Sequence, residues 1–426
     1  MSRLWAALLA AVVAGAGRAD DPPAAPDIPT ELQAKAQLLV RQLGSPSYQA
    51  REDATTELIK LGRAARLALA EAVASSPDYE VRARAARLLP RAEAADLQLR
   101  IDAFVADADG KLTHDLPGWD KFREHVGSDK ASRALFAEML KSVENREVLT
   151  GVAASKRDGG AAVSYRRTAL YLAQYPGAFG GIRVAGAMPP PKQPTIADIS
   201  TVLFGETAVP AADIPRTGPF QSITGATFAQ QQVSRETVNN PAANVHGEAY
   251  KRLLVKWLDT RSSPEDLTQA VYIANAFSQL KDMTPVLRRV VSTDGVQGQS
   301  RGQALVYLVQ RNKKTEHPFL KAQLKNDSVV TQVGLGPNPA GNGQVVATCQ
   351  LRDVALAILL TETSQNMHEY GFQMSPGTVA NPLGNPYPTY AFGADEDRDR
   401  ALRKWAEWEA THPIPAFDPG MLPAKK

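Results

Sequence analysis

The stretches SPSYQAREDATTEL, beginning at Ser45, and SPDYEVRARAARLL, beginning at Ser76, are two copies of one pattern set 31 residues apart. After the initial serine, they share five further residues at equivalent places: Pro46 and Pro77, Tyr48 and Tyr79, Arg51 and Arg82, Ala54 and Ala85, Leu58 and Leu89. Self-similarity at a period of about 20–50 residues is typical of stacked structural repeats. The sequence therefore predicts units that pack side by side.

Each copy has the features of the second helix of a helical hairpin. Ser47 and Asp78 stand where a helix N-cap is expected, and apolar residues follow at the spacing of one helix face. A partner helix is expected before each copy, over residues 30–43 and 64–74. The predicted unit is therefore a helix, a short turn and a second helix.

The skeleton of this unit is Arg-x-x-Ala-x-x-x-Leu, which returns in the C-terminal half of the chain. The small alanine lets two helices approach, and the leucine fills the groove one turn later. The arginine can reach across the first turn or to the previous repeat. Four copies carry this structural signature: Arg51, Ala54 and Leu58; Arg82, Ala85 and Leu89; Arg301, Ala304 and Leu308; Arg352, Ala355 and Leu359.

The segments DYEVRARAARLL and QLRDVALAILL resemble the second helix of HEAT repeats, which have an acidic residue, Val-Arg, then Ala and Leu. The chain as a whole resembles the exported HEAT-repeat proteins of certain bacteria. This resemblance implies an α-solenoid that recognises proteins, and it implies no catalytic residues. The predicted fold is all-α, with HEAT-like helical hairpins, long irregular loops and an inserted β-hairpin near residues 328–351, where two β-branched runs flank a Gly/Asn/Pro turn.

The N-terminus MSRLWAALLAAVVAGAGRAD has the pattern of a secretory signal peptide. Cleavage is expected after Ala19, with Ala16 as the second choice. No other stretch is long and apolar enough to cross a membrane. The protein is therefore expected to be exported to the periplasm, the cell surface or the medium, without a stable membrane span.

Composition changes along the chain predict its organisation. A signal peptide at 1–19 and a Pro-rich tether at 20–29 precede HEAT-like repeats at 30–152. Helices with Pro/Gly-rich loops follow at 153–245, then a second repeat region with the hairpin insertion at 246–410 and a tail at 411–426.

The loop from Asp107 to His125 is the best metal candidate, because it concentrates carboxylates and imidazoles. The weak candidate ligands are Asp107, Asp109, His114 and Asp115. An EF-hand template fails, since Val105 and Leu116 occupy ligand positions. The other interpretation is a solvated turn whose apolar residues dock on the core: Leu116, Trp119 and Phe122.

Little else in the sequence indicates chemistry. Cys349 is the only cysteine and lies among apolar residues, so it is interpreted as a small buried hydrophobe that forms no intrachain disulfide. The formal net charge of +3 on 426 residues is no evidence for nucleic acid binding. No cofactor or hydrolase motif is found, so no cofactor is predicted.

The function predicted from these observations is a non-enzymatic HEAT-repeat scaffold that binds a protein or peptide partner in the cell envelope. The hairpin insertion is expected to take part, since insertions in repeats often lie on the binding face. The alternative is a metal-dependent binder or an enzyme that uses the Asp107–His125 loop, and a purely structural role also stays open.

Overall fold

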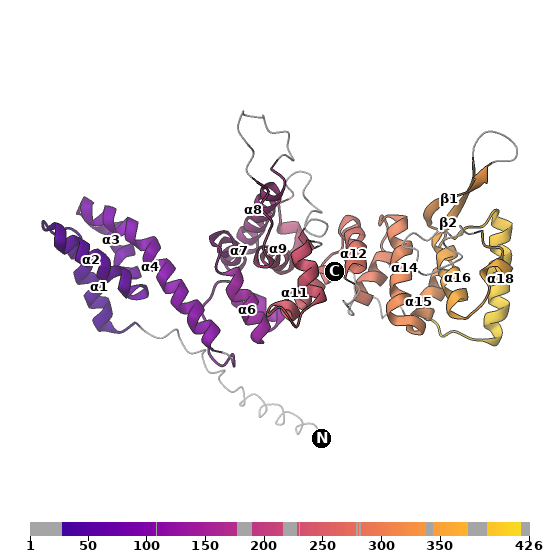
Figure 1. Cartoon of the computed structure of the whole chain (residues 1–426), viewed down its shortest axis with the longest axis horizontal. Helices are drawn as coiled ribbons and strands as arrows, with labels where there is room; N and C mark the ends of the chain where they lie inside the picture. The colour runs from indigo at the N-terminus through magenta and orange to yellow at the C-terminus, as the bar shows by residue number, and fades with distance from the viewer. Residues whose placement is uncertain are drawn as a thin grey trace, which may run out of the picture. The chain divides into compact units, whose positions relative to one another are not determined.

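The computed structural model is mostly helical, with one two-stranded antiparallel sheet (Figure 1). It describes residues 28–107, 109–176, 190–215, 228–229, 231–277, 280, 283–337, 344–373 and 390–418. The expected signal peptide and most of the Pro-rich tether lie outside these residues. The chain divides into two compact units, Met1–Trp119 and Asp120–Lys426. No described helix is both long enough and apolar enough to cross a membrane.

The first unit contains two helical hairpins. Helices α1 and α2 form one pair, and α3 and α4 form the other. Helix α1 also packs against α3, and α2 packs against α4, so the hairpins lie side by side. The bounds are α1 Thr30–Gln42, α2 Tyr48–Leu61, α3 Arg63–Ser75 and α4 Tyr79–Ala106.

The predicted N-caps are confirmed. Ser47 accepts a hydrogen bond from the Ala50 amide at 3.4 Å. Asp78 accepts one from the Glu80 amide at 2.8 Å and one from Val81 at 3.4 Å. Each cap fixes the start of the second helix of its hairpin.

The two copies of the repeat share one apolar core. Ala54, Leu58 and Ala85 are fully buried in it, while Leu89 packs against it partly exposed. The first helices repeat as well, with a shift of 29 residues that the sequence alone did not reveal. Four buried residues of α1 and its C-cap correspond to four of α3: Ala36 to Ala65, Leu39 to Ala68, Val40 to Leu69, and Leu43 to Ala72.

The second unit holds the remaining helices, from α6 onward; α5 (Trp119–Val126) spans the division between the units. Helices α5, α10 and α15 are not evident in the sequence. The bounds are α6 Lys130–Met139, α7 Val143–Ala154, α8 Lys156–Gln174, α9 Ile196–Ala208, α10 Gln232–Asn239, α11 Gly247–Asp259, α12 Pro264–Ala276, α13 Thr284–Ser292, α14 Gly298–Asn312, α15 His317–Gln323, α16 Leu351–Glu362 and α18 Asp395–Thr411. Short 3-10 helices are η1 Ala211–Asp213, η5 Lys313–Glu316 and η6 Met367–Tyr370.

The predicted hairpin is confirmed. Strand β1 (Val329–Pro337) pairs antiparallel with β2 (Gln344–Gln350), and the turn between them lies outside the described residues. Helix α14 packs against β1 and α16 against β2 (Figure 1). Cys349 is buried as expected, and burial raises the pKa of its thiol.

A buried ion pair fastens α18 to the base of the hairpin. Arg398 Nε donates to Asp353 Oδ1 at 2.8 Å, and its Nη2 donates to the Thr348 carbonyl at 2.9 Å. Trp405 on α18 is buried. The C-terminal helix is thus an integral part of the second unit.

The C-terminal copies of the repeat skeleton differ from the first two in the role of the arginine. Ala304, Leu308, Ala355 and Leu359 are all buried in α14 and α16, which pack together. Arg51 and Arg82 donate to the carbonyls of Ser45 and Ser76. In the later copies, Arg301 donates to the Val291 carbonyl, and Arg352 donates to the Gln350 side chain. The alanine and leucine positions therefore keep their packing role while the arginine contact changes.

Candidate functional site

Two of the four candidate metal ligands meet in the first unit. The His114 Nε2 atom lies 2.9 Å from Asp107 Oδ2, with both side chains buried. The Asp107 carboxylate also accepts hydrogen bonds at 3.0 Å from the amides of Lys111 and Leu112. The pair therefore closes the turn that follows α4.

The other two candidates lie elsewhere on the surface. Asp109 pairs with Lys111 at 2.8 Å, and Asp115 lies 3.7 Å from Arg100, both with largely exposed side chains. The described residues contain no group of three or more His, Cys, Asp or Glu side chains that could hold a metal ion. Leu116, Trp119 and Phe122 are buried, as expected for a docked turn.

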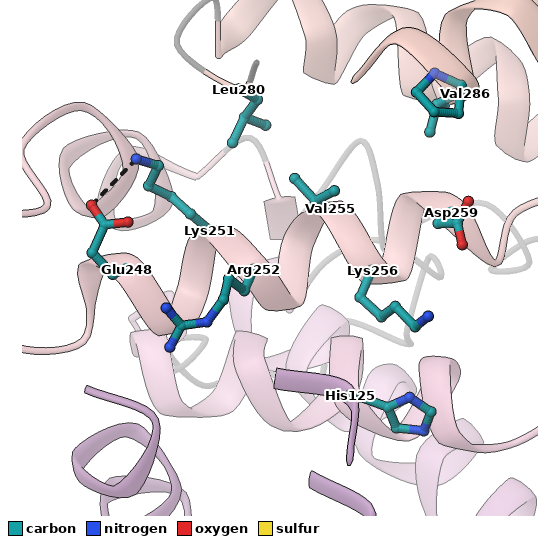
Figure 2. A pocket seen from close by; sticks show the side chains of 10 residues that line it. His125, Glu248, Lys251, Arg252, Val255, Lys256, Asp259, Leu280 and Val286 are labelled. Carbon is teal, nitrogen blue, oxygen red and sulfur yellow. Dashed lines mark hydrogen bonds and ion pairs between the residues drawn. The ribbon is translucent and has the colours of Figure 1, made fainter. Parts of the chain in front are cut away.

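An open groove over helix α11 in the second unit is a better candidate. It has a volume of about 610 Å³. Figure 2 shows its lining from α5, α11 and α13. We call it the α11 groove and define it by His125, Glu248, Lys251, Arg252, Val255, Lys256, Asp259, Leu280, Pro285 and Val286.

The sequence of α11 places these side chains on one face. Its apolar residues Tyr250, Leu253, Leu254, Trp257 and Leu258 recur at helical spacing and are buried. The groove residues occupy the positions between them. The buried face is held by Glu206 of α9, whose carboxylate accepts a hydrogen bond from Trp257 Nε1 at 2.8 Å.

Most charges along the groove already have partners. Lys251 pairs with Glu248 at 3.3 Å, and Asp259 with Arg289 at 3.1 Å. Arg252 reaches to the start of α6, where it pairs with Asp129 at 2.6 Å and also donates to the Val126 carbonyl. These contacts fix the walls of the groove and leave little net charge on them.

Lys256 is the exception, because it makes no ion pair with any residue that the structure describes. It lies on the same side of α11 as His125 (Figure 2). Burial lowers the pKa of His125, and the positive charges of Lys256 and Lys121 lower it further against the opposing charge of Glu124. At neutral pH the groove therefore presents the Lys256 cation, in addition to the paired Lys251, beside an uncharged imidazole.

The opposite wall is apolar. Val255 faces Leu280 and Val286 (Figure 2), and the latter two are almost fully buried. A cation on one side and an apolar wall on the other suit a ligand with a carboxylate next to an apolar side chain. The arrangement of the α11 groove therefore favours the binding of such a ligand.

A second polar cluster lies between α7, α8 and α9. Arg166 donates to Asn145 Oδ1 at 2.9 Å and pairs with Asp198 at 2.7 Å, and Asn145 donates to the same carboxylate at 3.0 Å. Burial by itself would raise the pKa of Asp198, but the hydrogen bonds from Thr195 and Asn145 and the charge of Arg166 hold it below its usual value. These partners give the cluster a structural role in joining three helices.

Sequence reasoning named His125 only as the end of the metal loop and missed the rest of the groove. The available signal was Val255 among Lys251, Arg252 and Lys256, an apolar residue on a charged helix face. No family model, curated protein or solved structure matches this chain.

Proposed function

We propose that this chain is a non-enzymatic, HEAT-like helical-repeat scaffold that binds a protein or peptide partner in the cell envelope. The interpretation as a helical-repeat protein is supported by the two side-by-side hairpins of the first unit, whose equivalent residues share one core. The pattern of residues 1–19 supports export. The partner segment is acidic and partly apolar.

The observation that carries the proposal is Lys256, which has no ion-pair partner among the described residues and stands opposite the apolar wall of the α11 groove. The volume of the α11 groove, about 610 Å³, lies within the range of pockets that hold a few side chains. A carboxylate of the partner would pair with Lys256, and an apolar neighbour would contact Val255 and the exposed Pro285. Charge complementarity of this kind gives specificity and speeds association.

The β1–β2 hairpin offers a second contact surface. Val329 and Val346 are more than half exposed on it. The strand edges of an isolated two-stranded ribbon can add a strand from a partner. We assign the hairpin an auxiliary role, because the α11 groove has the more specific chemistry.

The test is selection of a random peptide library on the purified chain and, separately, on the Lys256→Glu variant. We expect the unchanged chain to enrich peptides with an Asp or Glu beside apolar residues. A fluorescent copy of the consensus peptide should bind the Lys256→Glu variant about tenfold more weakly or worse, because attraction becomes repulsion. Raising the salt concentration should weaken the binding to the unchanged chain.

The matched control is Lys325→Glu, which reverses the charge of an exposed lysine outside the groove. It should leave the affinity for the consensus peptide unchanged. An enriched consensus without acidic residues, or equal loss of affinity in both variants, would rule out the α11 groove as the binding site.

A further inference from the structure

A short extended segment follows α18 and packs against α13 and α15. Within residues 413–418, Ile414 and Phe417 are half-buried, whereas Pro413, Pro415, Ala416 and Asp418 are exposed. The fixed φ of proline favours an extended backbone around Ile414. The segment thus presents two anchoring side chains that are three residues apart.

Phe417 is held by an aromatic ring and a cation. Its ring centroid lies 5.0 Å from that of Phe319, with 66° between the planes. The Arg288 guanidinium lies 5.4 Å from the Phe417 centroid and 5.7 Å from the Phe319 centroid. Both edge-to-face packing and the cation over the ring are favourable geometries for an aromatic anchor.

The receptor side contains an ion pair of its own. Arg288 Nε and Nη2 donate to the two oxygens of Glu316, each at 3.0 Å, and both side chains are largely buried. Phe319 is almost fully buried. Because Arg288 and Glu316 hold each other, a ligand that binds here need not order these two side chains.

The backbone of the segment is recognised as well. Lys321 Nζ donates to the Ile414 carbonyl at 3.1 Å and also pairs with Glu409 of α18. A contact to a carbonyl does not depend on the side chain at that position. The recognised pattern is therefore an extended backbone with an apolar residue and, three residues later, an aromatic one.

We propose that Arg288, Glu316, Phe319 and Lys321 form a recognition groove for extended, proline-containing peptide segments with this pattern, and that residues 413–418 occupy it in the absence of a partner. We call it the tail groove. The partner is therefore expected to share the sequence pattern of residues 413–418. Its covalent attachment gives it a high effective concentration, so a partner must compete with it. Binding of extended proline-containing segments to aromatic-lined surfaces is a recurring mode of peptide recognition.

This proposal uses none of the residues that line the α11 groove. The two sites can therefore fail separately. A chain with Lys256→Glu should bind a tail-groove ligand as the unchanged chain does.

The probe for the tail groove is a fluorescein-labelled peptide with the sequence of residues 411–420, THPIPAFDPG. Its anisotropy is measured with the full chain and with the full chain carrying Phe417→Ala. We expect the Phe417→Ala chain to bind the probe about tenfold more tightly or better, because its own segment has lost its anchor. A probe carrying the same Phe417→Ala change should bind that chain about tenfold more weakly than the unchanged probe.

A second receptor variant keeps the proposal testable. Lys321→Ala, introduced into the Phe417→Ala chain, should weaken probe binding several-fold while the far-ultraviolet circular dichroism stays unchanged. Equal affinity of the two chains for the probe, or of the two probes for the Phe417→Ala chain, would overturn the proposal. A dimer in light scattering that Phe417→Ala converts to a monomer would also overturn it, because the segment would then occupy a second copy.

Discussion

Arg51 and Arg82 make the same contact in the two copies of the repeat. Each guanidinium donates to the carbonyl oxygen of the serine six residues earlier, Arg51 to Ser45 at 2.8 Å and Arg82 to Ser76 at 2.5 Å. Each also lies near the exposed tyrosine that begins its helix. The arginine of the repeat therefore closes the turn of its own hairpin.

This contact predicts a modest, position-specific loss of stability. Arg82→Ala should lower the free energy of unfolding of the first unit by about 1–2 kcal/mol, because a charged hydrogen bond to a half-buried carbonyl is lost. Urea denaturation followed by circular dichroism measures the change. Arg87→Ala, at an exposed position of the same helix, should stay within about 0.5 kcal/mol of the unchanged chain. Equal effects of the two substitutions would show that the turn contact contributes nothing.

The stability of the second unit is expected to depend on the absence of a side chain at Gly298. A Cβ at this position would lie 2.1 Å from the Val329 carbonyl oxygen, so α14 approaches the start of β1 closely. Gly298→Ala should destabilise the second unit by about 1–3 kcal/mol, although alanine favours helices. Thermal unfolding measures the loss, and Gln297→Ala at the preceding exposed position is the control. An unchanged or raised melting temperature for Gly298→Ala would contradict the close approach.

Local signals predicted much of the fold. Caps at Ser47 and Asp78, helical spacing around Ala54 and Ala85, and the β-branched runs of the hairpin all depend on residues close in sequence. Gly298 illustrates the limit, because its sequence context indicates only a weak helix start. A glycine is required there because the Val329 carbonyl, 31 residues further along the chain, lies too close for a side chain.

The candidate site was largely hidden for the same reason. Arg252 contacts Val126 and Asp129, more than a hundred residues away, and the α11 groove exists only where these segments meet. In the Asp107–His125 loop, closeness in sequence suggested a site that the fold does not assemble. Asp107, Asp109, His114 and Asp115 are close in sequence, yet the fold turns two of them to the surface.

Buried histidines predict a loss of stability in mild acid. Burial lowers the pKa values of His125, His246 and His317 below the usual 6.5. A histidine that binds its proton more weakly in the folded chain adds stability above about pH 6.5, and this stability is lost as the pH falls through the folded pKa. We expect the melting temperature to fall by several degrees between about pH 7.5 and 5.5, above the range in which carboxylates with ordinary pKa values titrate.

The substitution His317→Gln should reduce this pH dependence, because it removes one of the groups whose protonation favours unfolding. His368→Gln, which replaces an exposed histidine of the same unit, should leave the dependence unchanged. A melting temperature that rises toward pH 5.5 would contradict the assigned direction of the pKa shifts.

The turn after α4 predicts independence from metal ions. The carboxylate of Asp107 is already engaged by His114 and by the amides of Lys111 and Leu112. A chelator should therefore leave the melting temperature unchanged. Asp107→Ala should cost about 1–3 kcal/mol because it leaves the two amides without their acceptor, whereas Asp109→Ala should stay within about 0.5 kcal/mol. Stoichiometric metal in the purified chain, lost on Asp109→Ala combined with His114→Ala, would instead support the metal-dependent alternative. Within the described part of the chain, the only ion pair of the Asp109 side chain is its surface pair with Lys111.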